Sequence, residues 1–379
     1  MTDRQTARVR RRRPWSGPLA ALLLVACLAG LAVLVLSALG AGEGTAPAQA
    51  SSTPAPAASA AAQRVCAWSR GDSASLERAA AAHALDEVDF DWYHSLRDGS
   101  LKPQWENLKL VSRAHALRVT VFATITNRLS HTSPFDGNIA SAILASASSR
   151  RAHIAKLVNL CVSRGFDGID MDWESMKAAD RGRFTSFMQQ LAAALHGRHK
   201  LLSIAVYPKV SEPGSYDAQR AQDYAKLGAA VDEFKVMTYA FSGGWSKPGP
   251  QMPLYWAKQV LAFARSKVPA RKVYMGMPFF GFDWKGSSAK YVLWKNVHAA
   301  QAKYGGSLSR DTDSRDAILK YADGSGGAHV VYFQDRYAVK AKTAWMKTKQ
   351  PQIAGMAIWV MGGEDPAFWP DIAAQLGRP

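Results

Sequence analysis

Short apolar segments alternate with amphipathic segments along the chain from residue 64 onward. The apolar segments are rich in β-branched and aromatic residues, as buried strands are, and they cover 65–68, 87–92, 119–126, 167–174, 201–207, 233–239, 273–278 and 353–360. Apolar positions spaced three or four apart predict helices between them, at 73–84, after 103, and at 149–164, 181–196, 217–227, 254–267 and 339–347. Strands that alternate with helices in this way predict an α/β fold, the (β/α)8 TIM barrel, over 64–379.

One segment interrupts this alternation. Residues 281–336 are too numerous for a single loop after the seventh strand, and they include aromatic side chains and an apolar run at 330–333. We expect a small α+β insertion here that forms one wall of the binding site.

The N-terminus has three different patterns. Residues 1–16 carry six Arg and one Asp, and residues 17–41 carry no charge. Such an apolar stretch is long enough to cross a bilayer core as a helix, and the preceding arginines favour a cytoplasmic head. Residues 42–63 are mostly Ala, Ser, Pro, Thr and Gly, as in a flexible tether. We therefore predict a single-pass signal-anchor at 17–41, in contact with the lipid bilayer, and an extracytoplasmic barrel.

Two alternatives to a permanent anchor stay open. Cleavage of a signal peptide after Ala50 would release a secreted protein. The segment 24–27, which ends at Cys27, resembles a lipobox, although the apolar run continues well past this cysteine.

The formal net charge of +17 leaves a basic external part after the head is set aside. This charge has two interpretations, a merely soluble basic surface or attraction to an anionic cell-wall polymer. We expect no nucleic-acid partner, because no nucleic-acid-binding motif is present. Cys66 and Cys161 lack metal-ligand spacing, and two separately buried thiols are a simpler interpretation than a disulfide.

The segment 166–174, Phe-Asp-Gly-Ile-Asp-Met-Asp-Trp-Glu, is the most informative in the chain. On a strand, Asp170, Asp172 and Glu174 share one face. In a barrel these acids face the interior, and each lies nearer than the one before to the C-terminal end of the barrel, where barrel active sites lie. Mutual repulsion and burial favour at least one retained proton, as a general acid requires. The alternatives are an edge strand or a metal site, and no histidine cluster supports the metal, so we expect neither metal nor cofactor.

This segment matches the DGxDxDxE signature of family 18 glycoside hydrolases, which the chain resembles over most of 65–375. The run 237–239 resembles the M-x-Y motif of the family, and the tryptophan on the last strand resembles its floor tryptophan. The segments 332–335 and 357–366 resemble the bacterial branch that includes spore-germination and cortex-lytic glycosylases. One position departs from the family pattern, because Ala240 stands where an aspartate is common, and this puts the sugar contacts in doubt.

The resemblance implies a retaining, substrate-assisted mechanism on a β-linked N-acetylglucosamine glycan, either peptidoglycan or chitin-like, by a monomer. Glu174 would be the general acid and base, Asp172 would hold the acetamido N–H, and Asp170 would tune Asp172. Tyr239 would donate to the acetamido oxygen, and Trp359 would form the floor under the sugar. The alternative is a non-catalytic glycan-binding envelope protein on the same barrel, but such proteins generally lose the last Glu of the signature.

Three further aromatic residues are candidate substrate contacts. Tyr207 and Trp92 end predicted strands, and Trp245 follows two glycines in a loop after the sixth strand. Simple packing is the alternative for each of them.

The predicted topology can be tested with reporters fused after Pro379. Alkaline phosphatase, which is active only after export, should be active in this fusion, and a fluorescent protein that folds only in the cytoplasm should be dark. The same reporters fused directly after residue 16 serve as the control. A bright cytoplasmic fusion after Pro379 would contradict the topology.

Overall fold

The computed structural model describes residues 62–379. The predicted head, span and nearly all of the tether lie outside these described residues. No helix within 62–379 is both long and apolar enough to cross a membrane.

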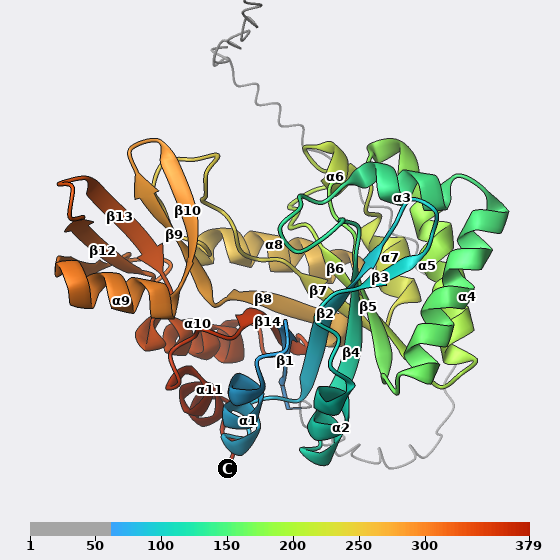
Figure 1. The fold of residues 1–379 in the computed structure, drawn as a ribbon, viewed down its shortest axis with the longest axis horizontal. Helices are drawn as coiled ribbons and strands as arrows, with labels where there is room; N and C mark the ends of the chain where they lie inside the picture. Colours follow the sequence, from blue (N-terminus) through green and yellow to red (C-terminus); the bar gives the residue numbers. More distant parts are fainter. Residues whose placement is uncertain (1–61) are drawn as a thin grey trace, which may run out of the picture. The chain divides into compact units, whose positions relative to one another are not determined.

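Eight parallel strands form a closed barrel (Figure 1). The barrel strands are β1 (Arg64–Ser69), β2 (Glu87–Ser95), β4 (Thr120–Thr126), β5 (Gly168–Asp172), β6 (Leu201–Val206), β7 (Glu233–Val236), β8 (Val273–Pro278) and β14 (Gly355–Met361). Each strand pairs with the next one in this order, beginning with β1 and β2. The pairing of β14 with β1 closes the ring. The short β3 (Leu101–Pro103) is antiparallel to β2. The predicted TIM barrel is confirmed.

Helices alternate with the strands. They are α1 (Ser73–Ala81), α2 (Leu108–Ala116), α3 (Gly137–Leu144), α4 (Ala147–Ser163), α5 (Arg181–His196), α6 (Asp217–Arg220), α7 (Tyr224–Ala230), α8 (Leu254–Lys267), α10 (Arg336–Lys349) and α11 (Phe368–Leu376), with 3-10 turns at Ala178–Asp180 and Ala270–Lys272. The helix predicted at 217–227 is two helices, because a new N-cap at Asp223 starts α7. The sequence patterns did not reveal α3 or α11.

The alternation along β5 produces the two sides of the barrel wall. Ile169, Met171 and Trp173 are at most 1% exposed and belong to the main hydrophobic core. Trp173 stacks on Phe187 of α5 with a ring separation of 5.2 Å. Burial of each such side chain contributes roughly 1.5–3 kcal/mol, and it fixes the register that turns the acids of the same strand inward.

The expected insertion after the seventh barrel strand is also confirmed. It is an antiparallel sheet of β9 (Phe280–Lys285), β10 (Ser288–Leu293), β11 (Ser307–Arg310), β12 (Ala317–Ala322) and β13 (Ala328–Phe333), with α9 (Trp294–Tyr304) packed on it. It has a hydrophobic core of its own, which includes Val297, Leu319 and Val331. Figure 1 shows this sheet beside the barrel.

Both cysteines of the barrel are separately buried free thiols, in agreement with the simpler interpretation of the sequence. Burial raises the pKa of Cys161 to about 12, so this thiol stays protonated and inert at neutral pH.

A fully buried lysine lies in the lower interior of the barrel. The Nζ atom of Lys235 donates to Glu87 Oε1 at 2.8 Å and to Asp89 Oδ2 at 2.7 Å. It also lies 3.4 Å from Glu233 Oε2 and 3.8 Å from Asp170 Oδ1. Burial opposes the charge, but the surrounding carboxylates outweigh it and hold the pKa of Lys235 well above its usual value.

The acids around this lysine outnumber the cations. Arg64 bridges Glu87 and Glu233 at 3.1 and 2.7 Å, so two cations face four carboxyl groups. Burial, together with repulsion from Glu87, raises the pKa of Glu233 to about 8. Burial raises the pKa of Asp89 to about 7. These two carboxyls can therefore keep protons near neutral pH, which limits the uncompensated charge.

Replacement of the buried lysine tests how far the barrel depends on it. Lys235→Met removes a charge that pairs with several buried acids, so we expect a loss of about 3–5 kcal/mol of unfolding free energy. Urea denaturation monitored by circular dichroism measures this loss. Lys258→Met on the exposed face of α8 is the matched control and should change stability by less than about 0.5 kcal/mol. Equal stability of the two variants would contradict the proposed role of Lys235.

Candidate active site

A cavity of about 690 Å³ opens at the carboxyl ends of the barrel strands. Two carboxylates from the segment around β5, Asp172 and Glu174, lie among its lining residues. Most of the rest is aromatic: Trp68, Phe135, Tyr207, Tyr216, Tyr239, Trp245, Phe280, Phe282, Tyr291 and Trp359. An apolar, aromatic wall around a few acids is typical of a small-molecule or sugar site.

Asp170 is the lowest acid of the segment and is fully buried. Its Oδ2 accepts hydrogen bonds from Trp68 Nε1 at 2.8 Å and from Thr124 Oγ1 at 3.1 Å, and its Oδ1 accepts from Ser203. With Lys235 also nearby, this carboxylate is fully held by the protein. Asp170 therefore lies among protein partners and is not among the residues that line the cavity.

Asp172 has the opposite character. It is 6% exposed, it lines the cavity, and its buried Oδ1 has no hydrogen-bond partner among the described residues. Burial, followed by repulsion from Glu174 and Asp170, raises its pKa well above the usual range. A carboxyl group that lines a cavity and has an oxygen without a protein partner is suited to a donor supplied by a ligand.

Glu174 follows β5 instead of ending it, since the strand stops at Asp172. Asn127 fixes its backbone by accepting from Glu174 N and donating to Glu174 O, both at 2.8 Å. The hydroxyl of Tyr207 donates to Glu174 Oε2 at 2.6 Å. This clamp directs the carboxyl group into the cavity.

Burial raises the pKa of Glu174, although the hydrogen bond from Tyr207 and the charge of Arg128 oppose the shift. The pKa values of Asp172 and Glu174 are thus both raised, and the two carboxyls titrate as a pair. Both carboxyls therefore hold their protons to a higher pH than exposed carboxylic acids do. The pair can act as a proton donor to a bound molecule.

Four of the other sequence-predicted residues line the cavity with the two acids, namely Tyr207, Tyr239, Trp245 and Trp359. Tyr239 comes from beyond the end of β7. The ring of Tyr239 fits because β8 carries Gly276, where a Cβ atom would lie 2.8 Å from Tyr239 Cε1. Trp359, on β14, lies edge to face with Trp68 at 6.0 Å. Tyr207 touches Glu174, as described, and Trp245 is 68% exposed at the rim.

The placement of Trp92 at the sugar site is wrong. The register of β2 against β4 shifts between Asp91 and Tyr93, so Trp92 is the extra residue of a bulge. Its side chain is fully buried and stacks on Phe90 with a ring separation of 3.9 Å. It packs on the helix side of the barrel wall and does not line the cavity.

Several residues of the site were not recognised from the sequence. Asn127 follows β4, Phe135 and Tyr216 come from loops, and Tyr291 comes from the insertion. The position of Asn127 directly after a buried strand is a signal that could have been used. Ala240 also lines the cavity, with a φ of 58°, so the position without the common aspartate does face the site.

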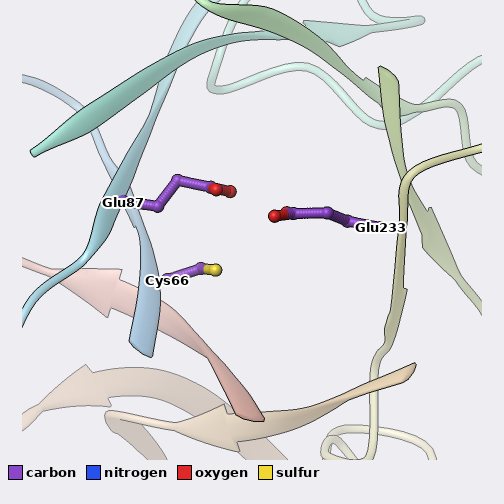
Figure 2. Close-up of side chains that lie close together, drawn as sticks. All are labelled: Cys66, Glu87 and Glu233. Atoms are coloured by element: carbon purple, nitrogen blue, oxygen red, sulfur yellow. The ribbon is translucent and has the colours of Figure 1, made fainter. Parts of the chain in front are cut away.

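One group of side chains within 62–379 has metal-ligand types close together, but it lies away from the cavity. The ligand atoms of Cys66, Glu87 and Glu233 lie within 4.8 Å of one another, and Figure 2 shows the two carboxylates pointing toward each other across the barrel. Arg64 and Lys235 already contact both glutamates, so a divalent ion would lie beside two fixed positive charges. We therefore assign these residues to the ion-pair network.

Comparison with known proteins agrees with this geometry. The sequence model of glycosyl hydrolases family 18 matches residues 126–364. The uncharacterized glycosylase YvbX of Bacillus subtilis (strain 168) is 27% identical over 313 residues, which cover 82% of this chain and 90% of that protein. The cortical fragment-lytic enzyme of Bacillus cereus is 29% identical over 286 residues, or 73% of this chain and 65% of that enzyme.

A solved structure shows the same fold. The crystal structure of a chitinase from Chromobacterium violaceum ATCC 12472 has a TM-score of 0.76 at 26% identity, and the match covers 84% of this chain and all of that one. The family match spans more than half of the chain and includes both carboxylates of the cavity. The chain therefore belongs to glycosyl hydrolase family 18 and is a glycosidase.

Proposed function

We propose that this glycosidase cleaves β-linked N-acetylglucosamine-containing glycan by a retaining, substrate-assisted mechanism, with Glu174 as the general acid and base. The observation that carries the proposal is the carboxyl group of Asp172, which lines the cavity and accepts no hydrogen bond at Oδ1 from the described residues, beside the clamped carboxyl of Glu174. An acetamido N–H is a donor of the kind that this oxygen lacks. A sugar without this group would leave the oxygen unsatisfied, at a cost of about 1–3 kcal/mol.

Binding of the acetamido group also explains how the proton reaches the leaving oxygen. A donor to Asp172 stabilises its ionised form, so the proton shared by the pair moves to Glu174. The acetamido oxygen then attacks the anomeric carbon while the glycosidic C–O bond breaks and Glu174 protonates the leaving oxygen. Glu174, now ionised, takes a proton from the water that opens the oxazolinium intermediate.

The remaining residues orient the reacting sugar. Tyr239 lies at the cavity wall, and burial with the nearby Asp172 and Glu174 raises its pKa well above the usual value, so it stays a hydroxyl donor for the acetamido oxygen. Trp359 offers an apolar floor for the ring. Trp245, at the exposed rim, provides an outer stacking surface.

We further propose that the glycan belongs to a cell envelope and that the barrel is anchored outside the cytoplasm by residues 17–41. The sequence of that segment and the basic external part support the location. The names of the relatives, a cortical fragment-lytic enzyme and a chitinase, support an N-acetylglucosamine polymer as the substrate.

The role of Glu174 predicts a large loss of activity on its replacement. Glu174→Gln preserves shape but removes the proton donor, and we expect kcat to fall at least ~10²–10³-fold on a fluorogenic N-acetylglucosamine oligomer. The melting temperature should change little. Glu77→Gln, at an exposed ion pair on α1, is the matched control and should keep full activity. A folded Glu174→Gln protein with near-normal turnover would eliminate the role, and an inactive wild type would favour the glycan-binding alternative.

The participation of the acetamido group predicts selectivity and inhibition. The enzyme should hydrolyse N-acetylglucosaminides and ignore the matching glucosides, and a thiazoline analogue of the cyclised intermediate should bind more tightly than substrate. Asp172→Asn should lower kcat strongly, because an amide stabilises the positive intermediate poorly. Mass spectrometry of the quenched enzyme provides the counter-test. A sugar covalently bound to Asp172 or Glu174 would show that a carboxylate is the nucleophile.

A further inference from the structure

Arg70 connects the cavity to a second exposed tryptophan. It follows β1 directly, and its side chain is 40% exposed. Its guanidinium carbon lies 5.5 Å from the ring centroid of Trp359, the cavity floor, and 6.0 Å from that of Trp105. A glycan that extends from the floor in this direction meets a cation before it meets the next aromatic surface.

Trp105 has the features of a binding surface. It is 52% exposed, and its ring stacks on His131 at 4.1 Å with an interplanar angle of 6°. Its φ of 65° is uncommon for a bulky side chain, and strain of this kind concentrates at functional sites. The half-exposed indole of Trp105, fixed by the imidazole of His131, offers a rigid surface on which a sugar ring can stack.

The positive charge in this region is only partly neutralised. Asp91 is the only carboxylate within 4 Å of Arg70 among residues 62–379, and its Oδ2 lies 3.7 Å from Arg70 Nε. The same oxygen is 2.7 Å from Arg128 and 3.2 Å from His131. Arg128 is 5% exposed and needs this carboxylate, whereas Arg70 is open to solvent. Because Asp91 is the one acid within 4 Å of both Arg70 and Arg128 in the described part of the chain, an excess positive charge remains at the rim of the cavity.

We propose that Arg70 binds a carboxylate on the sugar next to the one held over Trp359, so that the enzyme prefers peptide-free, muramic-acid-containing glycan to uncharged chitin. In peptidoglycan, N-acetylglucosamine alternates with N-acetylmuramic acid, whose lactyl ether ends in a carboxyl group. This carboxyl is a free carboxylate only where the peptide stem, which is otherwise amide-bonded to it, has been removed. Chitin has no charge at any position. The guanidinium group is suited to bidentate binding of a carboxylate. This inference rests on the proposed function, because it takes Trp359 as the floor of the sugar site.

The test measures binding in the Glu174→Gln background, so that turnover does not interfere. Calorimetry compares three tetrasaccharides: the N-acetylglucosamine tetramer, the alternating N-acetylglucosamine and N-acetylmuramic acid tetramer, and the latter with its carboxyls capped as methylamides. We expect Arg70→Gln to weaken binding of the charged tetramer roughly tenfold and to change the other two less than twofold. Arg70→Lys should keep part of the preference for the charged tetramer. The loss of affinity caused by Arg70→Gln should be smaller at high salt. Arg151→Gln, on exposed α4, is the matched control.

The possible outcomes separate the two proposals. Equal weakening of all three ligands would show that Arg70 only supports Trp359, and no weakening would show that it binds no carboxylate. The inference would also be overturned if the Glu174→Gln protein with Arg70 intact does not bind the charged tetramer more tightly than the capped one. If the wild-type enzyme hydrolyses none of the three tetrasaccharides, the proposed function is overturned instead. The binding comparison would still decide the role of Arg70.

Discussion

The structure depends on the way in which buried charge is compensated along the barrel axis. Acids from opposite strands point into the same interior, and at the lower end Lys235 and Arg64 neutralise part of their charge. Near the mouth, Asp91 is paired with Arg128. Asp172 and Glu174 have no ion pair of their own among the described residues, and burial raises the pKa of both. The same packing that closes the barrel therefore favours protonation of the two carboxyls at its mouth.

The substrate side of the site follows from the same arrangement. Asp170 is saturated by Trp68, Thr124 and Ser203, and this fixes the strand position from which Asp172 projects. Asn127 then holds the backbone of Glu174 beyond the end of the strand. Asp170 is thus fully satisfied by the protein, whereas Asp172 accepts no hydrogen bond at Oδ1 and Glu174 accepts one from Tyr207, and both of these acids line the cavity.

Sequence alone predicted the parts that depend on local periodicity. The acids of the β5 segment could be placed because alternation is strict on a strand with one buried face, and the barrel followed from the order of strands and helices. Trp92 was misplaced because a position at the end of a barrel strand does not by itself put a side chain at the cavity. Alternation places Trp92 on the outward face of β2 with Phe90, on which it stacks. Asn127 and Tyr216 escaped notice because loop positions converge only in the folded chain. The break between α6 and α7 lies within one helical pattern, where a single capping aspartate decides the boundary.

The insertion leaves the barrel after β8 and returns just before α10, and it buries its own core. It nevertheless supplies Phe280, Phe282 and Tyr291 to the cavity. One wall of the groove thus belongs to a module with a hydrophobic core of its own, whose length and sequence can change in evolution without a change in the register of the eight strands. Where related enzymes differ in the length or shape of the glycan that they accept, we expect the sequence changes responsible to accumulate in this module. The acids of the β5 segment, which carry the proton chemistry, are expected to stay constant.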